Sequence, residues 1–226
     1  MYSGLAVLAG YLFGSLSFAV IISRLMGLAD PRAYGSGNPG ATNVLRSGNH
    51  AAALLTLALD ALKGYVPVLL VLTFGPRYGM GMGMGTAGFV GLAAFVGHLW
   101  PVFFHFKGGK GVATAAGVLV ALSPWLALAT LVSWIIIAAF SRYSSLASIV
   151  AAAFAPFYQL LIWGLEPIFV PIVVMSLLLI WRHEGNIRKL LAGTESRLGQ
   201  KAPAPAAAAA RHRKEHHHEH KRGQRK

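Results

Sequence analysis

Long apolar stretches dominate the chain and constrain its fold more than any other feature. A helix of about 20 apolar residues crosses a lipid bilayer. With 55% of residues hydrophobic and 12% charged, the chain has too little polar surface to cover a soluble globule. The sequence therefore predicts an all-α integral membrane protein. Its apolar stretches occupy residues 4–23, 51–74, 80–104, 111–140, 146–163 and 167–181.

The stretch 111–140 decides how many times the chain crosses the membrane. It contains no charged residue, and as one helix it would be about 45 Å long, against a hydrocarbon core of roughly 30 Å. Ser123-Pro124 lies in its middle, where proline removes a helix hydrogen bond and restricts the residue before it. We therefore interpret this stretch as two short helices, which gives seven transmembrane helices in all.

The positions of Lys and Arg predict the orientation, because cytoplasmic loops collect these residues. With seven spans, the basic loop residues share one side and only Arg77 lies on the other. With six spans, the groups before and after 111–140 would face opposite sides. The first segment, 5–26, lacks the basic start of a secretory signal and is expected to be retained. We expect the N-terminus outside and the C-terminus in the cytosol.

The end of the chain differs in composition from the rest. Residues 197–226 hold nine Lys or Arg against two Glu, so the tail supplies much of the net charge of +13 and no nucleic-acid partner is expected. The Ala/Pro run 202–210 and the His-rich basic segment after it are typical of disorder. We predict a seven-helix membrane domain over 1–198 and a disordered linker and tail over 199–226.

The predicted connection after the first span is rich in glycine, amide and hydroxyl groups. Glycines let backbone N–H groups approach an anion, and an Arg can bind two phosphate oxygens at once. The alternative is an ordinary Gly/Asn turn. The pattern favours a phosphate site whose candidate polar residues are Ser36, Asn38, Thr42, Asn43 and Arg46.

A second cluster precedes the helix expected after residue 111. Lys107 and Lys110 flank the pair Gly108-Gly109, and the N-terminus of the next helix adds its positive dipole. The loop is not a Walker A motif, because Gly111 follows Lys110 where that motif has Ser or Thr. The two lysines predict an anion site, with positive-inside topology as the simpler alternative.

A third cluster, 182–195, follows the last span. His183 and Asn186 are three residues apart and share a helical face, which predicts a polar edge toward the site. The short segment 141–148 adds hydroxyls that either donate to phosphate or cap a helix, and capping is expected for Ser144 and Ser145.

Four further features of the sequence bear on its chemistry. The chain has no cysteine, which excludes disulfides and thiolate metal sites. His98 and His105 lack nearby carboxylates that would complete a metal site, so no metal or cofactor is expected. Asp60 and Lys63 are expected to form an ion pair within a span. Glycines in the segment 81–88 are expected to pack helices closely rather than to bind a dinucleotide.

The three clusters resemble the signature motifs of the bacterial acyl-phosphate:glycerol-3-phosphate acyltransferase family. Residues 35–46 are similar to its first motif, 106–114 to its second and 183–195 to its third, in the same order and with similar spacing. The resemblance implies that an acyl phosphate and glycerol 3-phosphate are converted to lysophosphatidic acid and phosphate. It places this reaction, the first step of phospholipid biosynthesis, at the cytosolic face of the bacterial inner membrane, among membrane lipids.

The resemblance also implies roles for particular residues. No His is followed by an Asp five residues on, so the His-Asp dyad of other acyltransferases is missing and substrate-assisted catalysis is expected. The alternative is a transporter of small organic phosphates, which would place polar residues deep within the spans. The implied catalytic residues are Lys110, Arg46, Ser36, His183 and Asn186, and the implied substrate-binding residues are Asn38, Thr42, Asn43, Lys107, Gly108, Gly109 and Ser148.

Overall fold

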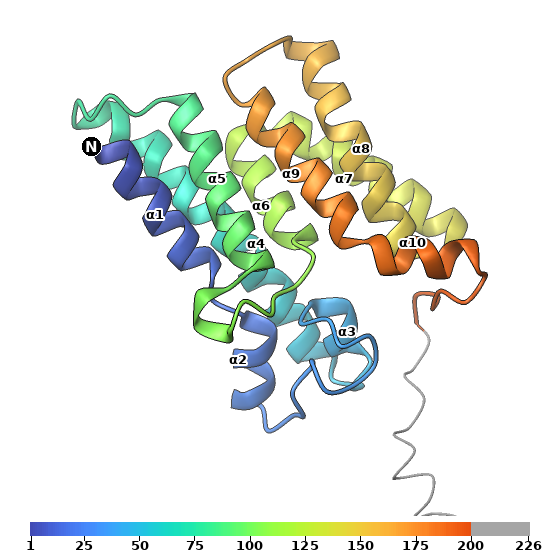
Figure 1. The fold of residues 1–226 in the computed structure, drawn as a ribbon. Coiled ribbons are helices and arrows are strands. Elements are labelled where there is room, and N and C mark those ends of the chain that lie inside the picture. The colour runs from blue at the N-terminus through green and yellow to red at the C-terminus, as the bar shows by residue number, and fades with distance from the viewer. Residues whose placement is uncertain (200–226) are drawn as a thin grey trace, which may run out of the picture.

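The structure, a computed structural model, describes residues 1–199, and every regular element in that range is helical. The predicted tail, from residue 200 on, lies outside the described residues. The helices form a bundle; α2 and α3 lie at its lower end in Figure 1, and α10 lies at the lower ends of α8 and α9. Their bounds are α1 Tyr2–Gly14, α2 Phe18–Leu25, α3 Ala41–Leu45, α4 His50–Arg77, α5 Met84–Leu99, η1 Val102–Phe104, α6 Val112–Leu122, α7 Pro124–Ser141, α8 Ser144–Trp163, α9 Phe169–Arg182 and α10 Glu184–Leu191.

Four of these helices are long and apolar enough to cross a membrane: α4, α5 together with η1, α7 and α8. A fifth span results if the bent pair α1 and α2 counts as one, and α6 and α9 are shorter apolar helices. The exterior agrees with a lipid environment, because only 17% of the apolar window of α7 is buried within the protein. The described chain is an all-α protein with an apolar surface.

The break predicted at Ser123-Pro124 is confirmed. Helix α6 ends at Leu122 and α7 begins at Pro124, where the Ser123 hydroxyl accepts a hydrogen bond from the backbone N–H of Leu126 at 3.4 Å. Proline suits the first position of a helix because its missing N–H would have had no partner there. The chain therefore returns along α7 to the end where the polar clusters lie (Figure 1).

The first apolar stretch, 4–23, which was predicted as a single span, is not one continuous helix. Helix α1 ends at Gly14, α2 starts at Phe18, and their axes differ by 40°. The Ser15 hydroxyl donates to the Tyr11 carbonyl at 2.8 Å, and the Leu16 carbonyl accepts from Lys63 Nζ at 2.7 Å. The bond from Lys63 takes the place of the bond from the Val20 N–H, which donates to Ser17 instead.

Glycines bring two pairs of helices into backbone contact. A Cβ on Gly117 would lie 1.9 Å from the Ala61 carbonyl oxygen, and one on Gly64 would lie 2.2 Å from that of Thr114, so α4 and α6 touch directly. Gly14 and Gly97 join α1 and α5 in the same way. Of the glycines in 81–88, Gly81 precedes α5 and has no atom within 4 Å of its Cβ position, so that part of the prediction is wrong. Gly88 does pack closely, because a Cβ there would lie 3.0 Å from Pro171 on α9.

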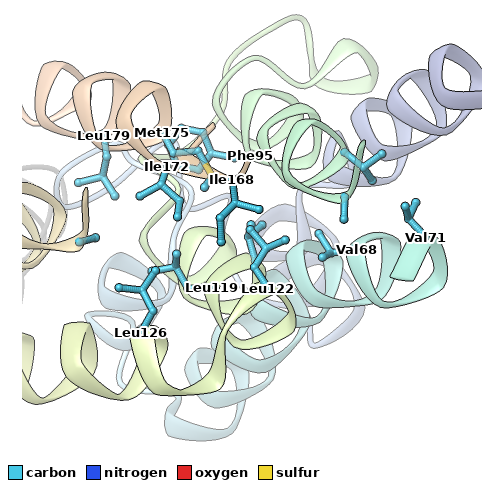
Figure 2. Close-up of a cluster of buried hydrophobic side chains, with 14 of the residues drawn as sticks. Val68, Val71, Phe95, Leu119, Leu122, Leu126, Ile168, Ile172, Met175 and Leu179 are labelled. Atoms are coloured by element: carbon cyan, nitrogen blue, oxygen red, sulfur yellow. The ribbon is translucent and has the colours of Figure 1, made fainter. Parts of the chain in front are cut away.

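A buried apolar cluster joins α4, α5, α6, α7 and α9 (Figure 2). Phe95 is fully buried in it, and a Cβ on Gly111 would lie 2.1 Å from the Phe95 ring. Gly111 has a φ of +85°, which glycine adopts without strain. The core therefore fixes the backbone immediately after Lys110 and the start of α6.

Candidate active site

Hydrogen bonds bring the second and third polar clusters together. Lys110 Nζ donates to Asn186 Oδ1 at 2.5 Å, and Asn186 Nδ2 donates to Glu195 Oε1 at 2.7 Å. The hydroxyl of Ser145, at the start of α8, donates to the same Glu195 oxygen at 2.7 Å. The loop before α6, helix α10, the segment after it and α8 thus converge on one chain of polar side chains.

Two of these residues were not assigned roles in the site from the sequence. Glu195 is the last residue of the third motif and was given no role from the sequence; in the structure it accepts a hydrogen bond from Asn186. Ser145 was expected to cap α8, but the N-cap is Tyr143 and makes no side-chain cap bond. The expected cap is therefore wrong, and the only sequence signal for Glu195 was its place in the motif.

Lys110 lies in a positively charged environment. Burial lowers its pKa to about 8; Glu195 opposes that shift, whereas the charges of Lys189, Arg46 and Arg182 add to it. Cations near one another raise the free energy of the protonated amine unless an anion is present. The arrangement therefore favours binding of a dianionic group such as phosphate.

Gly108 and Gly109 are packed between α5 and α9. Arg182 Nη2 donates to the carbonyl oxygens of both glycines, at 3.0 and 3.1 Å, and the Gly109 N–H donates to the His98 carbonyl at 3.1 Å. A Cβ on Gly108 would lie 2.1 Å from the His98 carbonyl oxygen. The glycines permit this close packing, and the Gly109 N–H, which was expected to bind an anion, already has a partner.

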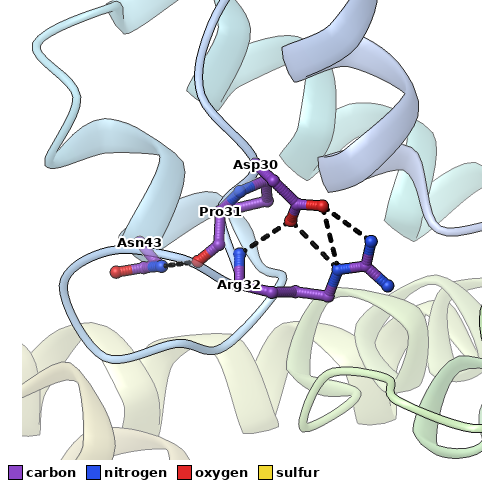
Figure 3. A network of polar contacts seen from close by, with 4 residues as sticks. All are labelled: Asp30, Pro31, Arg32 and Asn43. Atoms are coloured by element: carbon purple, nitrogen blue, oxygen red, sulfur yellow. Dashed lines mark hydrogen bonds and ion pairs between the residues drawn. The ribbon is translucent and has the colours of Figure 1, made fainter.

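Asn43 holds the first polar loop in shape. Its Nδ2 donates to the carbonyls of Pro31, at 2.6 Å, and Tyr34, at 3.2 Å, and its Oδ1 accepts from the Ser36 N–H at 3.0 Å (Figure 3 shows the bond to Pro31). The side chain is buried, with 2% exposed. Its amide is used within the loop, so the observed contacts are structural.

An ion pair stands beside this loop. Arg32 Nη2 lies 2.6 Å from Asp30 Oδ2, and both groups are partly exposed (Figure 3). The hydrogen bond from Arg32 holds the pKa of the Asp30 carboxyl below its usual value. Such an exposed pair contributes about 0–1 kcal/mol to stability.

The remaining candidates on the first and second loops are free to bind a ligand. None of their side chains forms a hydrogen bond or ion pair within residues 1–199, although Arg46 is close enough to Lys110 to affect its pKa. They lie before, in and after α3 and in the loop before α6. These residues are Ser36, Asn38, Thr42, Arg46 and Lys107.

His183 is a neutral side chain at the end of α9. Its pKa is lowered to about 4, first by burial and then by the charge of Lys110. Its Nδ1 lies 2.8 Å from the Leu179 carbonyl oxygen, which only accepts, so Nδ1 carries the proton. Nε2 therefore carries a lone pair and acts as a hydrogen-bond acceptor.

Ser148, the last predicted site residue, is held within the bundle. Its hydroxyl donates to the Ser144 carbonyl at 2.8 Å and accepts from Trp134 Nε1 at 3.0 Å. It is buried, with 5% exposed. In this arrangement its proton is engaged by the backbone of α8.

Replacing Asn43 by Ala is expected to loosen residues 31–46. The change removes three hydrogen bonds, each worth about 1 kcal/mol, and leaves the carbonyl of the buried Pro31 without its donor. Amide hydrogen exchange of this segment, measured by mass spectrometry, should rise at least about tenfold. Asn38→Ala is the matched control, since that side chain forms no hydrogen bond in the described chain. Unchanged exchange in the Asn43 variant would contradict a structural role.

The fold and the site together define a class: a helical membrane protein with cationic and polar side chains gathered around Lys110. Residues 4–193 match the family described as glycerol-3-phosphate acyltransferase. A protein of that name from Ralstonia nicotianae is 65% identical over 193 residues, which are 85% of this chain and 92% of the relative. Another, from Paraburkholderia phytofirmans, is 58% identical and covers 90% and 94% of the two chains. The chain belongs to the glycerol-3-phosphate acyltransferase family.

Solved structures agree with this assignment. The fold resembles that of PlsY (YgiH), described as an integral membrane glycerol 3-phosphate acyltransferase, in its glycerol 3-phosphate form. The TM-score is 0.80 at 41% identity, over 88% of this chain and 96% of PlsY. The lysophosphatidic acid form of PlsY gives a TM-score of 0.79. The chain is a multi-pass membrane protein and an acyltransferase of phospholipid biosynthesis, and the resemblance inferred from its motifs is confirmed at the level of this family.

Proposed function

We propose that this enzyme transfers an acyl group from an acyl phosphate to the 1-hydroxyl of glycerol 3-phosphate, giving 1-acyl-glycerol 3-phosphate and inorganic phosphate. The observation that carries the proposal is the convergence of Lys110, Asn186 and His183, with the charges of Arg46 and Arg182 nearby. PlsY, which is similar in fold, is known in forms with glycerol 3-phosphate and with lysophosphatidic acid. Glycerol 3-phosphate and lysophosphatidic acid both carry a phosphate group, which suits a cation-rich site.

The reaction requires little from a general base. The 1-hydroxyl oxygen attacks the acyl carbonyl, the bond between the carbonyl carbon and the phosphate oxygen breaks, and phosphate leaves with the bonding electrons. Lys110 and Arg46 stabilise the charge that develops on the phosphate and the carbonyl oxygen, and Ser36, Asn38, Thr42 and Lys107 hold the anionic groups. Within residues 1–199, Lys110 donates only to Asn186 and the other five side chains form no hydrogen bond, so all six have donors left for a ligand.

The attacking hydroxyl must lose a proton during the reaction. His183 Nε2 accepts a hydrogen bond from that hydroxyl and orients it, but a group with a pKa of about 4 binds a proton weakly. A phosphate monoester has a second pKa of about 6 and is the stronger base. The proton therefore moves to a phosphate oxygen of the substrate, which makes the catalysis substrate-assisted.

The assay that tests this function compares acyl donors. Purified protein receives labelled glycerol 3-phosphate with acyl phosphate, acyl-CoA or acyl-carrier protein, and labelled lysophosphatidic acid is separated and counted. Product is expected with acyl phosphate and at most traces with the thioesters. Equal use of acyl-CoA, or no product with acyl phosphate, would reject the proposed donor.

A falling activity at alkaline pH is expected from Lys110. Its pKa of about 8 means that the ammonium predominates below pH 8 and the neutral amine above it. Since the charged form holds phosphate, kcat/KM should fall as pH rises through about 8. The Lys110→Arg variant keeps its charge throughout this range. The kcat/KM of this variant should therefore not fall as the pH rises through about 8. A wild-type profile flat from pH 7 to 10 would contradict the assignment.

The membrane topology belongs to the same proposal: seven spans, the N-terminus outside and the site facing the cytosol of a bacterial inner membrane. Its support is that the polar clusters lie at one end of the bundle and that α6 and α9 are apolar (Figure 1).

Because the chain has no cysteine, a single cysteine introduced at Lys189 or at Tyr78, both exposed, reports the topology without background labelling. In intact cells an impermeant maleimide should label Tyr78→Cys and spare Lys189→Cys; the reverse pattern would invert the orientation. Transport of organic phosphates is not proposed, because the family is one of acyltransferases.

A further inference from the structure

A buried charged cluster lies directly beneath the site and has no role in the reaction above. The predicted ion pair is present: Asp60 Oδ1 is 2.8 Å from Lys63 Nζ. His98 Nδ1 lies 3.6 Å from the same carboxylate oxygen. The exposed fractions are 2% for Asp60, 1% for Lys63 and 7% for His98. Charges buried this deeply in a helix bundle are costly and call for a functional explanation.

Lys63 connects the cluster to the break in the first apolar stretch. Its Nζ donates to the Leu16 carbonyl at 2.7 Å and lies 5.8 Å from the centre of the Phe18 ring. The ammonium thus supplies a donor to a carbonyl that the bend between α1 and α2 leaves without its helical partner. These contacts explain why a charged Lys63 is buried at this position. They do not explain why Asp60 and His98 are buried beside it.

His98 connects the cluster to the loop that carries Lys110. On one side its Nδ1 faces Asp60 and has no hydrogen-bond partner in the described chain. On the other, a Cβ on Gly109 would lie 2.2 Å from His98 Nε2, so the imidazole edge rests on the Gly109 backbone. The His98 carbonyl also accepts the Gly109 N–H at 3.1 Å. The ring and the backbone carbonyl of His98 therefore both contact Gly109, the residue immediately before Lys110.

Arg182 holds the same loop from the opposite side, through the carbonyl oxygens of Gly108 and Gly109. The glycine pair is thus contacted by the His98 imidazole and by the Arg182 guanidinium. Two glycines have no side chains of their own to fix their conformation. Their geometry, and with it the direction in which Lys110 leaves the loop, depends on what packs against them.

We infer that Asp60 and His98 are positioning residues: the buried carboxylate fixes the His98 ring, the ring fixes Gly109, and this places the Lys110 ammonium against Asn186. The chain of contacts runs from α4 through α5 to the loop and ends at the site. Neither residue touches substrate. The inference predicts a change at Lys110 when Asp60 or His98 is altered, whereas a purely structural cluster predicts lower stability alone.

The direct test is the titration of Lys110 in the full-length protein in detergent micelles. Each lysine is acetylated with an N-hydroxysuccinimide ester over a range of pH, and peptides are resolved by mass spectrometry. In the His98→Asn variant, the shorter side chain still reaches toward Asp60 but no longer covers Gly109. The loop should then loosen and expose Lys110 to water. Its titration midpoint should rise by about one pH unit toward the ordinary lysine value. The exposed Lys189 in the same sample should titrate unchanged.

Asp60→Asn tests the other half of the chain of contacts. The single change leaves the Lys63 ammonium buried without its counter-ion, so this variant is at risk of not folding. The neutral double variant Asp60→Asn/Lys63→Met is therefore measured beside it. Both are expected to shift the Lys110 midpoint upward as His98→Asn does. The matched control is Gln159→Leu, a change at a buried polar residue of α8 whose side chain has no hydrogen-bond partner among residues 1–199. It should leave the Lys110 midpoint unchanged, whatever its effect on stability.

Turnover supplies an independent readout that rests on the proposed function. His98→Asn should lower kcat/KM about tenfold in the wild-type background and have little further effect in a Lys110→Met background, where there is no ammonium left to position. A folded His98→Asn protein with an unchanged Lys110 midpoint would overturn the inference, as would equal losses in both backgrounds. If wild type makes no product from acyl phosphate, the proposed function fails while the titration still decides the positioning.

Discussion

Replacing Lys110 by Met is expected to reduce kcat/KM by about 100- to 1,000-fold, the usual cost of losing one donor to the developing charge of a transition state. Methionine keeps the length of the side chain and removes its charge. The loss also releases Asn186 Oδ1, which accepts from Lys110 in the resting site. Initial rates of lysophosphatidic acid formation, measured at several concentrations of each substrate, give the effect.

Lys189→Met is the matched control for this change. Lys189 is exposed on α10 and forms no hydrogen bond through its side chain in residues 1–199, although its charge acts on Lys110 over a distance. Its loss is expected to change kcat/KM less than about threefold, because interactions between exposed charges are screened. If the two variants were equally active, Lys110 would not hold a reacting group.

Replacing Glu195 by Ala is expected to cost both activity and stability. Glu195 Oε1 accepts from Ser145 and from Asn186, and its charge acts on Lys110. Hydrogen bonds to a charged group contribute about 1.5–3 kcal/mol each, so the variant should unfold at a lower temperature. It should also lose at least about tenfold in kcat/KM as Asn186 and Lys110 lose their arrangement. Thermal unfolding in detergent and the acyl phosphate assay measure the two effects.

The control for Glu195 lies in the same cluster. Glu184 pairs with Arg188 across one turn of α10, and both side chains are largely exposed. Such a pair contributes about 0.3–0.5 kcal/mol, so Glu184→Ala should leave stability and turnover nearly unchanged. Glu195→Gln keeps an acceptor without the charge and should fall between the two. Loss of function in Glu184→Ala as large as in Glu195→Ala would show that the site is not organised around Glu195.

The sequence predicted the features that depend on local patterns. The apolar stretches, the break at Ser123-Pro124 and the gathering of three polar clusters at one end all follow from hydropathy, proline chemistry and the parity of charged loops. The bend between α1 and α2 was missed, because it depends on Lys63, far along the chain. A continuous apolar run gives no sign that a distant ammonium will bind one of its carbonyls.

The candidate site shows the same limit. Lys110 and Asn186 were both predicted, but their contact joins residues 76 positions apart, which no local pattern reveals. Asn43 was predicted as a ligand because turn-forming and phosphate-binding segments share the same residue types, and the structure gives it three bonds within the loop. Residue type identified the neighbourhood of the site; only packing separates the residues that hold the loops from those left free.

The shortness of α6 has a consequence for how a lipid meets this enzyme. Eleven residues form a helix of about 16 Å, roughly half the thickness of a hydrocarbon core. Such hydrophobic mismatch is relieved by thinning the bilayer locally or by seating the end of the helix below the headgroup layer. Either adjustment shortens the distance between the acyl chains and Lys110, at the start of α6. For the proposed acyl phosphate donor, this shortens the displacement along the membrane normal that brings its head group to Lys110.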